Sequence, residues 1–327
     1  MQLSAILVLC ALAACGPDYQ VPDPVDNDSS VSGGSQGSGD NNGNNDGGGD
    51  NTGGGTGGQQ TTPGLLAADG DDAGTYSLIT GCGYNYETPD NSGEHASAPF
   101  RHIRQRYDDV LKKNVFDFYI HIQNDDDRGL ASVKDRQRNE IKTDAKSPKT
   151  MVAQEGETLR MTWKFRLPAG MLTTTSFCHI HQLKGIDNSA GNADVGHPMI
   201  TYTCRSTSEG KQQFQVIYVG RTLEDGTVPG NDYFGKYDLA DFLGQWVSVS
   251  ETVTFSKNGS YHLVIYRVSD GKQLVKIDKT GVDLWRNGTT GLRPKWGIYR
   301  SFGNNRSLAS QLRDEVLGFA DFQIEKL

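Results

Sequence analysis

The chain has 327 residues, of which 35% are hydrophobic, and this is enough apolar content for one sizeable folded domain. Its formal net charge of −8 is unevenly divided, because all 32 lysines and arginines lie after residue 100, where the net charge is +5. A basic domain fits an anionic partner, but no dense basic run and no known nucleic-acid motif is present, so we expect no nucleic acid partner.

The N-terminal residues contain a short apolar run from Leu3 to Ala14. The run is too short to span a bilayer and has the length of a signal-peptide core. It ends in L-A-A-C-G, which resembles a bacterial lipoprotein processing site, although no lysine or arginine precedes the run. The resemblance implies lipidation of Cys15 and a lipid-anchored location in the bacterial cell envelope. The alternative is an ordinary cleaved signal peptide with a chance cysteine.

Residues 16–64 consist mostly of Gly, Asn, Asp, Ser and Thr, and Tyr19 is their only aromatic residue. Such a segment buries too little apolar surface to offset the entropy lost on folding, so we expect a disordered tether. A flexible coil of this length spans about 40 Å root-mean-square. The chain is therefore expected to comprise a signal peptide at 1–15, a tether at 16–64 and a folded domain at 65–327.

Many short segments of the folded domain alternate between apolar and polar residues, as β-strands do. Asn-Gly, Asp-Gly and Gly-Asn pairs between them indicate turns. Only Ile103–Leu111 has the apolar spacing of a helix. These features predict an all-β sandwich or jelly roll. The expected strands are Val115–Ile122, Leu159–Leu167, Phe177–Lys184, Met199–Arg205, Gln213–Val219, Trp246–Phe255, Tyr261–Val268, Lys295–Ser301 and Val316–Ile324.

Two of these strands, Phe177–Lys184 and Met199–Arg205, can be paired as a hairpin about a loop centred near Gly191. In this register His179 and His181 share one face with two threonines and Arg205, while the opposite face is mainly apolar. The clean separation of polar and apolar side chains favours this register over one shifted by a single residue.

The same register sets Cys178 directly opposite Cys204. A disulfide is permitted outside the cytoplasm, but a bridge between directly opposed strand residues is often strained. We therefore expect two buried free thiols, and a bridge from Cys82 to either cysteine stays open as an alternative.

Three segments place ionisable side chains on a single strand face, because strand side chains alternate with period two. The segments are Arg138–Lys142, His179–His181 and Lys295–Tyr299. If the strands share a sheet, their side chains converge on one surface suited to acid–base chemistry on an anionic polymer. The converging side chains are Arg138, Glu140, Lys142, His179, His181, Lys295 and Tyr299.

The order of these segments resembles the signature strands of the jelly-roll polysaccharide lyases related to alginate and glucuronan lyases. That family carries R-x-E-x-R, Q-I-H and Y-x-K-A-G-x-Y-x-Q strands, where this chain has R-N-E-I-K, H-I-H and K-W-G-I-Y-R-S. The chain departs from the pattern at His179, Lys142 and Ser301, where the family has Gln, Arg and Gln. The resemblance covers roughly residues 115–327 and implies a concanavalin A-like sandwich with a substrate groove across its concave sheet.

The resemblance also implies a polysaccharide lyase, which cleaves a uronate-containing anionic polysaccharide by β-elimination. Such an enzyme removes the C5 proton and expels the oxygen at C4 once the neighbouring carboxylate is neutralised. Arg138 and His179 would stabilise the resulting enolate. Tyr299 would protonate the leaving oxygen, and either His181 or Tyr299 would be the base. Further substrate contacts would come from Lys295, Glu140, Lys142 and Arg205.

This chemistry requires no cofactor, and we expect no catalytic metal. The pair His179 and His181 could bind zinc on a strand, but no spaced set of ligands completes a site. The third ligand would have to be His121, His197 or Glu140. A structural calcium ion is possible at Asp125–Asp127, although three adjacent acids more often form a solvated turn.

The sequence bears on two other functional classes. A glycoside hydrolase would need two carboxylates on one strand face or on facing strands, and no Glu-x-Asp-x-x-Glu-like strand is present. A non-catalytic carbohydrate-binding lipoprotein of the same fold is the alternative, because it would use the same basic groove without Tyr299 or His181. We expect a monomer that binds an acidic polysaccharide and attaches to a membrane through Cys15.

Overall fold

The computed structural model describes residues 61–91, 100–130 and 132–327. The predicted signal peptide, the lipidation site at Cys15 and most of the tether lie outside these residues, so they stay predictions. Ordered contacts begin just before the expected domain boundary, since the carbonyl of Gly64 accepts hydrogen bonds from the backbone of Ile324 and the hydroxyl of Tyr84. None of the helices in the described ranges has the length and apolar character needed to cross a membrane.

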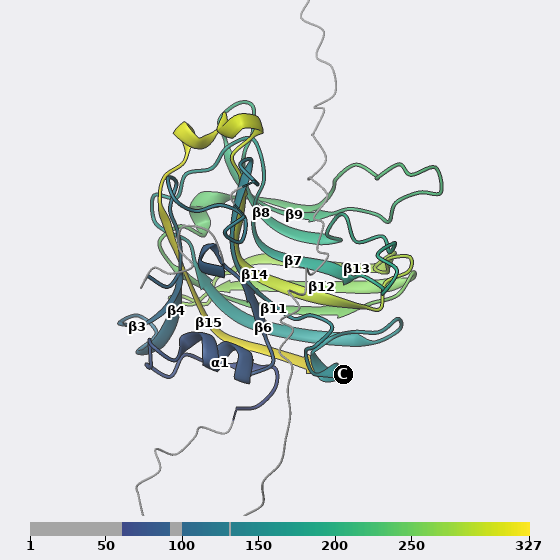
Figure 1. Ribbon diagram of the computed structural model, residues 1–327, viewed down its shortest axis with the longest axis horizontal. Coiled ribbons are helices and arrows are strands. Elements are labelled where there is room, and N and C mark those ends of the chain that lie inside the picture. Colours follow the sequence, from purple (N-terminus) through teal and green to yellow (C-terminus); the bar gives the residue numbers. More distant parts are fainter. Residues whose placement is uncertain (1–60, 92–99, 131) are drawn as a thin grey trace, which may run out of the picture.

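Two antiparallel sheets lie face to face and form a β-sandwich, which confirms the predicted fold class (Figure 1). Sheet A contains, in spatial order, β13 (Gln273–Val282), β12 (Gly259–Arg267), β11 (Trp246–Thr254), β6 (Thr158–Arg166), β15 (Glu315–Lys326), β4 (Lys113–Ile120) and β3 (Ile103–Asp108), and β1 (Leu65–Leu66) pairs with β15. Sheet B contains β10 (Asp232–Asp238), β9 (Gln212–Tyr218), β8 (Ile200–Ser206), β7 (Cys178–Ile186), β14 (Gly291–Ser301), β5 (Arg136–Lys142) and β2 (Asn85–Glu87). The helical segments are α1 (Thr75–Gly81) and the short 3-10 turns η1 (Pro89–Asn91), η3 (Lys149–Met151), η4 (Leu239–Asp241), η5 (Asn304–Arg306) and η6 (Ala309–Gln311).

The core fills the space between the two sheets, because each strand directs alternate apolar side chains inward. The ring centroids of Trp163 in β6 and Trp296 in β14 lie 5.6 Å apart, and those of Phe165 and Phe214 lie 6.1 Å apart. Burying a large apolar side chain contributes about 1.5–3 kcal/mol, so these cross-sheet contacts hold the layers together. The face of sheet B that points away from sheet A is here called the outer face.

All the strands expected from alternation are present, with ends within four residues of the predicted ones. The structure adds β1, β2, β3, β10 and β13, which were not predicted. In β13, charged residues on the exposed face surround Val275 and Ile277, the two buried apolar residues. Short or highly charged strands of this kind carry little alternation, so their formation depends on pairing with a neighbour.

The predicted helix at Ile103–Leu111 is wrong. Residues 103–108 form β3, which pairs with β4 from Ile103 opposite Phe118 to Asp108 opposite Lys113. Of the four apolar residues that suggested helical spacing, Ile103 lies in the core and Leu111 packs against a small buried cluster, whereas Tyr107 and Val110 are 56% and 61% exposed. Hydrogen bonding to the neighbouring strand therefore overrides the local pattern, and the actual helix, α1, was not predicted.

The three described cysteines are buried and free, so the expected free thiols are confirmed. His179 pairs with Thr203, which places Cys178 and Cys204 one step further along the same two strands. Burial raises the pKa of Cys178 to about 12, so its thiol stays protonated at neutral pH.

Candidate active site

The outer face of sheet B brings together three of the predicted catalytic residues. Tyr299 in β14 pairs with Arg138 in β5 on one side and with His179 in β7 on the other. The guanidinium carbon of Arg138 lies 3.9 Å from the centroid of the Tyr299 ring, and the His179 ring centroid lies 5.9 Å from it. The predicted convergence of these three side chains is therefore present in the structure.

A second guanidinium contacts the same phenol. Arg136 Nη1 donates a hydrogen bond to the Tyr299 hydroxyl at 3.0 Å, and Arg136 also pairs with Asp135. The Arg136 side chain is 12% exposed and Tyr299 is 3% exposed, so the Arg136 side chain is the more exposed of the two. Arg136 was missed from the sequence, although the alternation of Arg138 and Glu140 continues back to it along β5.

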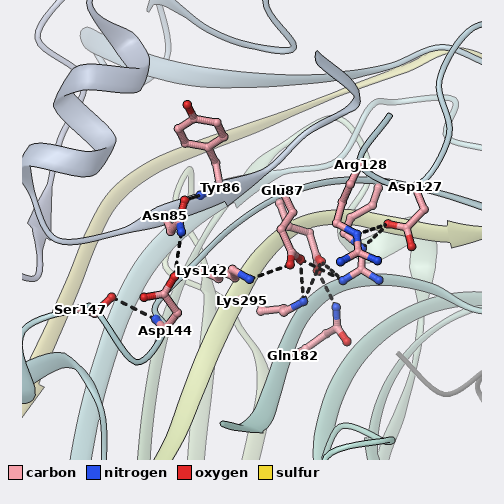
Figure 2. A network of polar contacts seen from close by, with 12 residues as sticks. Asn85, Tyr86, Glu87, Asp127, Arg128, Lys142, Asp144, Ser147, Gln182 and Lys295 are labelled. Atoms are coloured by element: carbon pink, nitrogen blue, oxygen red, sulfur yellow. Dashed lines mark hydrogen bonds and ion pairs between the residues drawn. The ribbon is translucent and has the colours of Figure 1, made fainter. Parts of the chain in front are cut away.

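A buried network of ion pairs lies beside the tyrosine, centred on Glu87 of β2 (Figure 2). The Glu87 carboxylate accepts hydrogen bonds from Lys295 at 2.7 Å, Lys142 at 2.7 Å and Arg138 at 3.0 Å. Arg138 Nε also bonds Asp127 at 2.8 Å, and its Nη1 contacts Glu140 at 3.3 Å. Lys295, Lys142 and Arg138, which were predicted to contact the substrate, thus form ion pairs with carboxylates of the chain itself.

Glu87 stays ionised in this network. Burial alone would raise the pKa of its carboxyl, but the charges of Lys295, Arg138 and Lys142 outweigh burial and hold the pKa well below its ordinary value. Lys295, Glu140 and Arg138 have no exposed surface, so their charges position one another rather than present themselves to solvent. Sequence reasoning missed Glu87, because it sits on a three-residue strand outside any recognised motif.

The prediction that His181 shares the outer face with His179 is wrong. A β-bulge in β7 changes the register there, since His179 pairs with Thr203 but His181 pairs with Tyr202. The His181 ring points into the core, where Nε2 lies 3.0 Å from a carboxylate oxygen of Glu251 and Nδ1 lies 2.8 Å from the carbonyl oxygen of Lys295. The ring has no exposed surface, so His181 cannot act as the catalytic base.

Glu251 of β11 supplies the physical reason for the bulge. Its carboxylate is fully buried between the sheets and accepts hydrogen bonds from the hydroxyls of Tyr202 at 2.8 Å and Tyr261 at 2.7 Å. A buried carboxylate is costly unless several donors surround it, and the turned-in His181 ring completes the set. The signal was present in the sequence, because Glu251 occupies an inward position between Val249 and Val253.

Replacing His181 with alanine is expected to lower the free energy of unfolding by about 3 kcal/mol, because it leaves the buried Glu251 short of a partner. Turnover per folded molecule should change by less than about threefold, since the ring does not reach the outer face. Urea denaturation and initial rates measure the two effects. His262, an exposed histidine paired with Asp278, is the control, and His262→Ala should cost no more than about 0.5 kcal/mol. Lost turnover at unchanged stability would contradict the core placement.

Gly297 allows β14 and β5 to approach closely beside the tyrosine. Its φ is +147°, and a Cβ atom there would lie 2.1 Å from the carbonyl oxygen of Asn139 and 2.7 Å from the Cα of Glu140. Any side chain would push the strands apart. The pairing of β14 with β7 shifts register between Trp296 and Tyr299, around this glycine, and this shift sets Tyr299 opposite His179.

Further cations lie along the outer face of sheet B. Arg205, which was predicted, lies on β8, two residues beyond Thr203 and on the same face. Lys184 and Arg293 face one another across β7 and β14 and were not predicted. All three are at most 6% exposed. Lys184 is fully buried, whereas Arg205 and Arg293 keep some exposed surface and, together with Arg136, give this face a strip of positive charge.

The sequence suggested two alternative metal sites, one for zinc and one for calcium. His179 and His181 lie on opposite faces of sheet B, so they cannot share a zinc ion. The possible calcium site at Asp125–Asp127 stays a prediction, although Asp125 contacts two histidines and Asp127 pairs with Arg138, and none of these partners is an oxygen ligand.

No family model matches this sequence, and no curated protein matches it. Among solved structures, the chain is similar to endo-β-1,4-glucuronan lyase from the fungus Trichoderma reesei, with 13% identity over 74% of this chain and 94% of that one and a TM-score of 0.48. It is also similar to alginate lyase A1-II', a member of polysaccharide lyase family 7, with 11% identity over 74% and 94% of the two chains and a TM-score of 0.46. For alginate lyase Aly36B the identity is 13% over 75% and 97%, with a TM-score of 0.44. These identities of 11–13% do not establish an activity or a substrate for this chain.

Proposed function

We propose that this protein is a polysaccharide lyase that cleaves a uronate-containing, anionic polysaccharide by β-elimination. The observation that carries the proposal is the environment of Tyr299, whose hydroxyl accepts a hydrogen bond from Arg136 and whose ring stacks against Arg138. Two guanidinium groups stabilise the negative charge of a phenolate, so the phenolate can take up a proton as a base and the resulting phenol can return it as an acid.

In the proposed reaction the Tyr299 phenolate removes the C5 proton of the uronate. The electrons of the broken C–H bond form the C4–C5 double bond, and the C4–O bond breaks. The leaving oxygen then takes the proton back from the phenol. With His181 in the core, Tyr299 performs both transfers, and this requires the proton and the leaving group to lie on the same side of the sugar ring.

His179 is suited to stabilising the enolate that forms during this step. Its Nδ1 lies 2.8 Å from the hydroxyl of Thr203, which fixes the orientation of the ring beside Tyr299. In the proposed complex its Nε2 faces the substrate carboxylate. Arg138, which is buried and paired with Glu87 and Asp127, acts as a positioning residue that holds the Tyr299 ring.

The substrate class follows from the charge of the outer face. The strip formed by Arg136, Arg205 and Arg293, whose side chains keep some exposed surface, attracts a polymer with regularly spaced carboxylates. The alternative, a non-catalytic carbohydrate-binding protein, would use this strip without the phenol. Production of an unsaturated sugar separates the two.

A screen of acidic polysaccharides tests the proposal. We expect at least one of alginate, glucuronan, pectate, hyaluronan, heparin and ulvan to yield a product that absorbs in the ultraviolet, because β-elimination creates a double bond conjugated with the carboxylate. Neutral dextran is the control and should yield none. Binding of acidic polymers without any unsaturated product would establish the binding protein instead.

A further inference from the structure

A cluster of two imidazoles and two carboxylates lies outside the candidate active site, where β3 begins and β4 ends. His102 directly precedes β3, His121 follows β4, and Asp125 lies in the loop between β4 and β5. His102 Nε2 lies 3.0 Å from Asp125 Oδ1, and His121 Nδ1 lies 3.2 Å from Asp125 Oδ2. One possible ligand atom from each of the three residues lies within 4.8 Å of the others.

We propose that His102, His121 and Asp125 bind a zinc ion. Zinc bonds to imidazole nitrogen and carboxylate oxygen are about 2.0–2.2 Å long, so neighbouring ligands of a tetrahedral ion lie about 3.3 Å apart. The two separations of 3.0 and 3.2 Å, each to a different oxygen of Asp125, are close to this value. Two nitrogens and one oxygen suit zinc, whereas calcium takes oxygen ligands alone.

The surroundings of the cluster match those of metal-bound histidines. Asp90 Oδ1 lies 3.3 Å from His102 Nδ1, on the side of the ring opposite Asp125, and so orients Nε2 toward the cluster. The backbone N–H of His121 donates to Asp125 Oδ2 at 2.6 Å. The Phe100 ring packs against both imidazoles, with centroids 5.0 and 5.2 Å away. The side chain of His121 is 29% exposed, which leaves a route for the ion and for a water molecule as fourth ligand.

The ion would tie the loop after β4 to the start of β3. This loop also carries Asp127, which pairs with Arg138 in the candidate active site. Gln137 supports the loop from β5, because its side-chain amide donates to the carbonyls of His121 and Asp125. The zinc therefore has a structural role, and it fixes a segment that helps to position Tyr299 through Arg138.

A proton is the competing occupant of the cluster. Burial alone would lower the pKa of His102, but its hydrogen bonds to Asp125 and Asp90 raise the pKa to about 9. A protonated His102 held by two aspartates would keep the same side chains together without any metal, and the experiment must separate these two states.

Elemental analysis of the purified full chain by mass spectrometry provides the test, with about one zinc expected per molecule. His121→Ala and Asp125→Asn should each abolish stoichiometric zinc, and Asp90→Asn should weaken zinc binding about 10- to 100-fold. His262→Ala is the matched control, since His262 also pairs with an aspartate but lies outside the cluster, and it should keep the zinc.

Competition with a chromophoric chelator measures the affinity of the wild-type protein directly, so the test does not depend on whether a variant folds. The melting temperature should fall when zinc is removed and recover when zinc is added back. A wild-type protein that contains no zinc and takes none up at micromolar concentrations would overturn the proposal and establish the proton-held network. None of these readouts involves lyase activity.

Discussion

Tyr299→Phe is expected to reduce the rate of double-bond formation by about 10²- to 10⁴-fold, the usual contribution of general acid–base catalysis. The phenylalanine ring preserves the stacking on Arg138 but removes the hydroxyl that exchanges protons with C5 and the leaving oxygen. Affinity for the polymer should stay within about threefold, because the cations of the outer face are unchanged. Ultraviolet initial rates and isothermal titration calorimetry measure the two quantities.

The matched control for this variant is Tyr266→Phe. Tyr266 lies on β12 in the other sheet, is 39% exposed, and its hydroxyl donates a hydrogen bond to the side chain of Gln273. Its loss should leave both rate and affinity unchanged. If Tyr299→Phe turned over substrate at nearly the wild-type rate, the tyrosine would not be the acid–base group and the proposed mechanism would fail.

Glu87→Gln is expected to lower the free energy of unfolding by about 3–5 kcal/mol, as removal of one partner from a buried ion pair does. Glutamine has nearly the same shape but leaves Lys295, Lys142 and Arg138 facing one another with less compensating charge. Urea denaturation measures the change. The control is Glu157→Gln at a partly exposed pair with Lys326, which should cost no more than about 1 kcal/mol.

The pH dependence of the difference in unfolding free energy between the wild type and Glu87→Gln tests whether the ionised Glu87 carboxylate is responsible for it. The pKa of Glu87 is lowered in the folded protein, so its stabilising effect is fully present above the unfolded carboxyl pKa of about 4.3 and is lost as the pH falls toward the folded pKa. The stability gap between wild type and Glu87→Gln should thus be constant from about pH 7 to pH 5 and shrink only below about pH 4. A gap that closes between pH 7 and pH 5 would show that another group is responsible.

The sequence predicted the sandwich because alternation is a local property, and most strands carry enough of it to be recognised. It also predicted that Tyr299, Arg138 and His179 converge, since all three lie on strands with regular alternation up to that point. It failed at His181, because the period-two rule assumes an unbroken strand and the bulge is imposed by Glu251 on the opposite sheet. A rule that considers one strand at a time cannot take account of a contact with a residue on the other sheet.

The network of ion pairs around Glu87 could not be predicted from the sequence for a related reason. Glu87 and Lys295 form an ion pair although they are 208 residues apart in the sequence. Glu87 lies on β2, a strand of three residues that depends on its pairing with β5. Arg136 was missed although it lies only two positions before Arg138. Local patterns therefore identified Tyr299, Arg138 and His179, to which we assign roles in the proposed reaction, but not the residues that neutralise and position them.

The place of β15 in sheet A has a consequence for how the chain folds. β15 is the last strand in sequence, yet it lies between β6 and β4 and also pairs with β1, with Leu65 opposite Gln323. Until the ribosome has made β15, the edges of β4 and β6 have no partner and the sheet is two separate pieces. Contacts of such long range form slowly, so the joining of the two pieces of sheet A by β15 is expected to be a late step of folding.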